Sequence, residues 1–88
     1  MTDIALSRSQ LKRALEHLQA NDWQAAHAIV QKDEDSPLAC WAHGIVHLME
    51  GDVPNARYWY GQAKRAFPAK ANAALEVDAL KRALDAAK

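Results

Sequence analysis

The sequence predicts an all-α protein, a five-helix antiparallel array of helical hairpins, and three observations support this. The chain of 88 residues holds nineteen alanines but only 3 glycines and 3 prolines, a composition that favours helices. Apolar side chains recur three and four residues apart over most of its length, as they do on one face of an α-helix. Residues that commonly cap helices stand between these apolar runs. The length suffices for one domain with one core.

The first hairpin is expected over residues 7–33. Apolar residues lie at helical spacing from Leu11 to Leu18. Ser7, followed by Gln10 three residues later, fits a capping box, so a helix is predicted over about residues 7–20. Asp22 then fits the N-cap of a second helix, "WQAAHAIVQK", because its carboxylate can accept hydrogen bonds from the free amides of the first turn.

The second hairpin is expected over residues 36–67. Ser36 as cap and Pro37 in the first helical position predict a third helix, because the amide that proline lacks would have no partner there. Gly51 should end this helix in the left-handed conformation, and Asp52 should cap the fourth helix. We expect the fourth helix to close at Pro68. Its inward stripe should consist of Val53, Ala56, Tyr60, Ala63 and Phe67.

A last helix is expected over residues 70–87. Its apolar residues are spaced alternately four and three apart, which gives a narrow seam suited to one partner groove. They are Ala73, Val77, Leu80, Leu84 and Ala87. The pairs Asp78–Arg82 and Lys81–Asp85 should form ion pairs on the outer face. This seam could cap the array or pair two copies, and we expect a homodimer through the C-terminal helix.

The chain shows a weak internal repeat when it is displaced by thirty residues. "HLQANDWQAAHAIV" (residues 17–30) then aligns with "HLMEGDVPNARYWY" (residues 47–60), with identities at the helix end, the turn and a small packing position. The second hairpin resembles a tetratricopeptide repeat (TPR) over about residues 37–70. The positions that carry the resemblance are Gly44, Gly51, Asp52, Ala56, Tyr60, Ala63 and Pro68. The departures are Cys40, His43 and His47, where the repeat has tryptophan, leucine and tyrosine.

The resemblance implies two TPR-like hairpins, a C-terminal capping helix and a groove that accepts peptides. It also implies that the third helix is sandwiched, because its positions 40, 43, 44 and 47 would face neighbouring helices. The first hairpin matches the repeat only at its turn and at Ala26. The stretch "WAHGIVHLMEGDVPNARYWYGQA" also resembles segments of short, uncharacterised bacterial all-helical proteins, a resemblance that implies no activity.

Charge and composition exclude several classes of function. Eleven basic and eleven acidic residues give a formal net charge of 0, so no global field attracts nucleic acid or an anionic membrane. A basic stretch within residues 53–75 is interleaved with aromatic residues, but the neutral chain disfavours nucleic-acid binding. No apolar run approaches the roughly 20 residues of a membrane span. With one cysteine and no signal-peptide pattern at the start, the sequence predicts a cytoplasmic location.

The motif "HGIVH" raises the possibility of a metal site. It places His43 and His47 on one face of the third helix, with Glu50 one turn later. Together with His27 of the second helix, these residues could form a three- or four-ligand site for zinc or another transition metal. The alternative is a helix interface at which neutral histidines hydrogen-bond to neighbouring groups. The sequence favours the alternative, because the motif lacks the glutamate that marks a metalloprotease helix.

The function expected from the sequence is a non-enzymatic protein–protein interaction module that binds a protein or a peptide. The candidate partner-binding residues are Tyr58, Trp59, Gln62 and Arg65. We expect no cofactor and no catalysis, since Cys40 lies inside a helix and no phosphate loop or cofactor fingerprint is present. The second hypothesis is a metal- or small-molecule-binding protein centred on His27, His43, His47 and Glu50.

Overall fold

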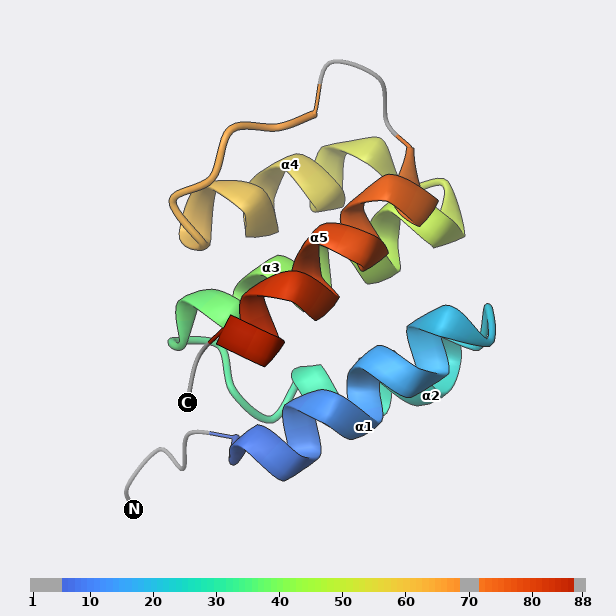
Figure 1. The fold of residues 1–88 in the computed structure, drawn as a ribbon. Coiled ribbons are helices and arrows are strands. Elements are labelled where there is room, and N and C mark those ends of the chain that lie inside the picture. Colours follow the sequence, from blue (N-terminus) through green and yellow to red (C-terminus); the bar gives the residue numbers. More distant parts are fainter. Residues whose placement is uncertain (1–5, 69–71, 87–88) are drawn as a thin grey trace.

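The computed structural model describes residues 6–68 and 72–86 of the chain. Within these ranges the chain forms five α-helices, so the all-α prediction is confirmed (Figure 1). They are α1 (Arg8–Gln19), α2 (Trp23–Val30), α3 (Pro37–Glu50), α4 (Val53–Gln62) and α5 (Ala73–Ala86). Their packing is compact: the radius of gyration is 11.6 Å, close to the value of about 12 Å for a folded chain of this length.

Most helix ends form where the local cap residues predict them. The Ser7 side chain accepts a hydrogen bond from the Gln10 amide, and the Gln10 side chain accepts one from the Ser7 amide, which confirms the capping box. Asp22 and Asp52 cap α2 and α4 by accepting from the amide three residues later, at 3.1 and 3.3 Å. Gly51 ends α3 with a φ of 88°, a conformation that glycine adopts without strain.

The start of α3 is held by an acid further upstream. Ser36 occupies the N-cap position, as predicted, but its side chain makes no capping hydrogen bond. The buried Asp33 accepts instead, from the amides of Asp35 and Ser36 at 3.0 Å and from the amide of Leu6 at 2.9 Å. Burial alone would raise the pKa of Asp33, but the hydrogen bonds from Ser36, Leu6 and Asp35 together hold it below 3.8. This carboxylate therefore ties the segment before α1 to the turn before α3.

α4 is shorter than the sequence suggested, because it ends at Gln62 and not near Pro68. Lys64 adopts a left-handed φ of 59°, and the Arg65 amide donates to the Tyr60 carbonyl at 3.0 Å. This hydrogen bond satisfies a free carbonyl at the helix end and reverses the chain. Gly61 in the last turn also lowers the helix propensity.

Only part of the apolar stripe that was expected to face inward therefore lies within α4. Ala56, Tyr60 and Ala63 are buried, whereas Val53 is 40% exposed. Phe67 lies beyond the helix and still reaches the Tyr60 ring, with the ring centroids 5.4 Å apart. The apolar spacing was a correct guide to contact but not to the length of the helix.

α3 is the central helix of the fold. It contacts α1, α2, α4 and α5, and every residue from Ala39 to Val46 is buried. It lies close to α4 at Gly44, where a Cβ atom would be 2.5 Å from Cδ1 of Tyr60. The expectation that this helix is sandwiched between its neighbours is confirmed. His43 is consequently buried, whereas His47 near the end of the helix is partly exposed.

α5 packs across α1 and α3 (Figure 1). Val77, Leu80 and Leu84 of its seam are buried within the chain, and the predicted seam residue Ala87 lies outside the described residues. The ion pairs Asp78–Arg82 and Lys81–Asp85 form on the outer face at 2.8 and 3.0 Å, as predicted. A homodimer through α5 stays a prediction, and it would have to use a face other than this buried seam.

One carboxylate links α5 to α3 and α4. Glu76 accepts a hydrogen bond from Nε1 of Trp41 at 3.1 Å and another from the Tyr60 hydroxyl at 2.6 Å. Burial and this contact raise the pKa of Tyr60, which therefore stays a neutral hydrogen-bond donor. These two hydrogen bonds thus add to the apolar contacts of α5 and hold it in position along α3 and α4.

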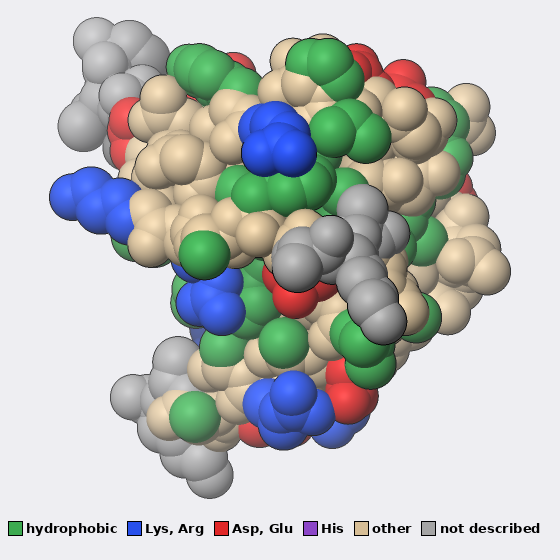
Figure 2. Space-filling model, turned by 90° about the horizontal axis from the view of Figure 1, so that it is seen from above, with side chains coloured by type: hydrophobic (Ala, Val, Ile, Leu, Met, Phe, Trp, Pro, Cys, Tyr) green, Lys and Arg blue, Asp and Glu red, His purple; other side chains and the backbone are tan. Residues whose placement is uncertain are grey.

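On the face seen in Figure 2, basic and acidic side chains are scattered among apolar and polar surface, and neither sign of charge dominates. This agrees with the formal net charge of 0. None of the helices within residues 6–68 and 72–86 combines the length and the apolar character that crossing a bilayer requires. The cytoplasmic location stays a prediction.

Candidate metal centre

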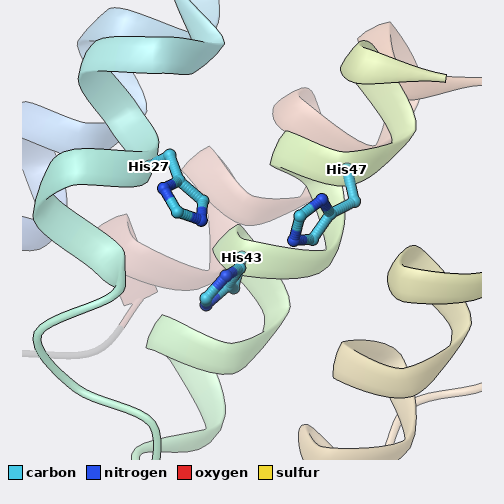
Figure 3. Close-up of side chains that lie close together, drawn as sticks. All are labelled: His27, His43 and His47. Carbon is cyan, nitrogen blue, oxygen red and sulfur yellow. The ribbon is translucent and has the colours of Figure 1, made fainter. Parts of the chain in front are cut away.

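Three of the four histidines converge between α2 and α3. His27 projects from α2, and His43 and His47 project from successive turns of α3 toward it (Figure 3). Each offers one ring nitrogen, and these three nitrogens all lie within 4.8 Å of one another. The spacing of four residues stacks His43 and His47 on one face of α3. The contact between α2 and α3 brings His27 to that face.

The rings are packed as well as close. The planes of His43 and His47 are inclined by 21° with centroids 5.2 Å apart, and His27 meets His43 edge-on at 4.9 Å. On its other side, His43 stacks on Trp59 of α4, with centroids 3.9 Å apart and an interplanar angle of 8°. Trp59, which was expected to bind a partner, lies half-buried against this cluster. No feature of the sequence indicated that it would stack on His43.

Glu50 contacts His47 and does not join the group of three nitrogens. Its Oε1 lies 2.8 Å from Nδ1 of His47. A hydrogen bond at Nδ1 leaves Nε2 as the free nitrogen of this ring, and the ring nitrogen of His47 in Figure 3 that faces the other two histidines is the one distal to its Cβ. Histidines that bind metal in proteins almost always donate their second ring N–H to such a carboxylate or carbonyl. Glu50 is therefore placed to orient His47, where the sequence had suggested a ligand.

His43 carries a buried nitrogen with no hydrogen-bond partner. His43 is only 3% exposed, and its Nδ1 forms no hydrogen bond with any group among the described residues. Leaving such an atom unsatisfied costs about 1–3 kcal/mol. The alternative interpretation of the sequence, that the histidines satisfy their nitrogens on nearby groups, is correct for His47 but fails for this atom.

Burial keeps His43 neutral. Loss of hydration, followed by repulsion from His27 and His47, lowers its pKa from 6.5 to about 3. A neutral imidazole has a free lone pair, which is the form that binds a metal ion. Protonation of His43 is thus disfavoured, and its nitrogen donor remains available at neutral pH.

This arrangement fits a transition metal. Zinc binds histidine nitrogen at about 2.0–2.1 Å in a tetrahedron, so two of its ligand nitrogens stand about 3.3 Å apart. The three nitrogens lie within 4.8 Å of one another, so each distance between two of them has to shorten by about 1.5 Å at most. Rotation of the side chains can supply this change. Imidazole donors also suit copper, nickel and iron.

A second group of possible ligands shares His47 but is already engaged. It comprises His47, Glu50 and Asp52. The Asp52 carboxylate caps α4 and also accepts from the Asn55 side chain at 2.7 Å, while Glu50 holds His47. The hydrogen bonds of these carboxylates are local and structural, so the three-histidine group is the stronger candidate.

The remaining histidine and the cysteine lie apart from the site. His17, in the last turn of α1, belongs to neither group of possible ligands. Cys40 is fully buried, and its thiol donates to the Glu34 carbonyl at 3.3 Å. Burial raises the pKa of the Cys40 thiol, and Asp33, Asp35 and Glu34 raise it further, so the thiolate that a nucleophile needs is disfavoured.

The other predicted partner-binding residues lie on or just after α4. Tyr58 is 56% exposed, and Gln62 is also exposed. Arg65 is exposed too, but its guanidinium lies 3.5 Å above the centroid of the Trp41 ring and so packs against the protein. These side chains do not border a surface groove of about 710 Å³ that lies between the α1–α2 turn, the end of α3 and the start of α5.

Comparisons with known proteins found no match. No protein-family model fits the chain, and neither a curated protein nor a solved structure is significantly similar to it.

Proposed function

We propose that this protein binds a divalent transition-metal ion through His27, His43 and His47. The observation that carries the proposal is the convergence of three imidazoles on one point, one of them with a buried nitrogen that has no other partner. A metal ion bound by that nitrogen would remove the cost of leaving it unsatisfied. Zinc fits the ligand set best, because three neutral nitrogen donors are common in its sites.

Metal binding would also join two parts of the fold. His27 belongs to α2, whereas His43 and His47 belong to α3. An ion that bonds to both helices stabilises their contact, because the unfolded chain does not hold the three nitrogens together. At a free metal concentration of one hundred times the Kd, the free energy of unfolding rises by about 2.7 kcal/mol. For a domain of this size, that corresponds to an increase in Tm of about 10–20 °C.

Thermal unfolding of the untagged protein, stripped of metal by a chelator, tests the proposal. We expect zinc to raise the Tm of the wild type and to leave the Tm of His43→Ala unchanged. His27→Gln provides a second variant, since this half-buried side chain can change without opening a cavity in the core. His17→Ala is the matched control and should keep the full zinc response. An equal response in all four proteins, or none in the wild type, would rule out the three-histidine site.

A second proposal is interaction with a protein or peptide, on a TPR-like arrangement of the two hairpins. It is supported by the exposed aromatic side chain of Tyr58 beside Gln62 on the outer surface of α4. The double variant Tyr58→Ala and Gln62→Ala should lose any partner that copurifies with the wild type. Arg65 is left unchanged, because its removal would disturb Trp41. Retention of every copurifying partner would argue against this surface.

A further inference from the structure

The three histidines leave one coordination position of a tetrahedral ion to another donor. Structural zinc sites use four protein ligands, whereas sites with three protein ligands keep the fourth position for water or a substrate. Within residues 6–68 and 72–86, the donor group around His27, His43 and His47 contains no fourth side chain.

The nearest carboxylates are engaged elsewhere. Glu50 lies 2.8 Å from Nδ1 of His47, which is not the nitrogen that faces the other histidines. Asp52 accepts from the backbone and the side chain of Asn55 at 3.3 and 2.7 Å. For either to become the fourth ligand, it would have to give up these contacts and move around the His47 ring.

The charge of the site favours an anion at the fourth position. Neutral imidazoles donate lone pairs without reducing the charge of the ion, so a divalent ion keeps two positive charges in this ligand set. A site with carboxylate or thiolate ligands would neutralise that charge itself. Here Glu50 contacts only the His47 ring, so an anionic exchangeable ligand would supply negative charge at the ion itself.

Access to the ion is from one side. Trp59 covers one face of His43, and His43 itself is 3% exposed. His27 and His47 are both partly exposed, so solvent reaches the cluster along these two rings.

We propose that a metal ion held by His27, His43 and His47 keeps its fourth position open and binds a small anion there as an exchangeable ligand. The class includes hydroxide, azide and thiocyanate. This inference rests on the proposed function, and it names the ligand that the same site takes.

Visible spectroscopy of the cobalt(II)-loaded protein tests the inference. Cobalt takes the place of zinc, and its absorption bands in the visible range respond to the number and type of its ligands. The protein is titrated with sodium azide at constant pH and ionic strength, alongside the variant Glu50→Gln. Native mass spectrometry of the same samples gives the ratio of metal to chain and the number of chains. We expect one cobalt ion per single chain, and a saturable change of the spectrum with azide in both proteins.

Each other outcome has a separate meaning. Bound cobalt whose spectrum ignores azide in both proteins would show that the position is closed, and would overturn this inference while leaving metal binding intact. A response in Glu50→Gln alone would identify Glu50 as the fourth ligand. One cobalt ion shared by two chains would place a ligand of the second copy there, and would also overturn the inference. A wild type that binds no cobalt would refute the proposed function itself.

Discussion

Replacing Gly44 by alanine should destabilise this protein, although alanine is ordinarily the better helix residue. A Cβ at this position would lie 2.5 and 2.7 Å from two carbons of the Tyr60 ring, far inside van der Waals contact. Tyr60 cannot easily retreat, because its side chain is 1% exposed and its hydroxyl is hydrogen-bonded to Glu76. Either α4 must move away from α3 or the ring must leave its site.

The expected magnitude follows from two opposing effects. Insertion of one carbon into a well-packed core typically costs about 1–3 kcal/mol. The higher helix propensity of alanine returns about 1 kcal/mol of this. Since two atoms of a fixed ring are in conflict, we place the cost in the upper half of its range. The free energy of unfolding of Gly44→Ala should therefore fall by about 1–2 kcal/mol.

Urea denaturation of the metal-free protein, followed by circular dichroism, measures this change. Gly61→Ala is the matched control, because it lies inside α4 and a Cβ there meets no atom within 4 Å. That variant should gain up to about 1 kcal/mol. The two midpoints should thus fall on opposite sides of the wild type. If Gly44→Ala proves as stable as Gly61→Ala, the close approach of α3 and α4 is wrong.

Further predictions concern three carboxylates. Asp33→Asn should lower the free energy of unfolding by about 1.5–3 kcal/mol at neutral pH, because three amides lose a charged acceptor. The pKa of Asp33 lies below 3.8 in the folded protein, so its contribution is complete above that pH and is lost as the pH falls through the folded pKa. The urea midpoints of Asp33→Asn and the wild type should therefore converge in acid. Glu76→Ala should cost about 1–3 kcal/mol in the same assay, because Trp41 and Tyr60 lose their shared acceptor; no loss would mean that this link is not formed. Glu50→Ala should weaken zinc binding about 10–100-fold in isothermal titration calorimetry, with a smaller effect for Glu50→Gln. An unchanged affinity would show that Glu50 does not orient His47.

The helices were predictable from sequence where their signals are local. The capping box at Ser7, the caps at Asp22 and Asp52 and the left-handed Gly51 each depend on a few neighbouring residues. The end of α4 was missed, because apolar spacing continued past the point where Lys64 turns the chain. The part played by Asp33 was also missed, since its contact with Leu6 joins residues that are far apart in sequence.

The candidate site was half predictable. The spacing of His43 and His47 placed both on one face of a helix, and the hairpin pattern suggested His27 as a third member. Whether these rings meet depends on how α2 docks on α3, which no local pattern specifies. The packing of α4 on α3, which no local pattern specifies either, places Trp59 over His43. The role of Glu50 depends on a side-chain conformation, which the sequence does not reveal.

Native mass spectrometry of the untagged, zinc-loaded protein tests metal binding by the three histidines most directly. We predict one zinc ion per chain, removed by a chelator, absent from His43→Ala and retained in His17→Ala. A metal-free wild type, or the same zinc content in His43→Ala, would contradict it, and the cluster would then be a packed helix interface.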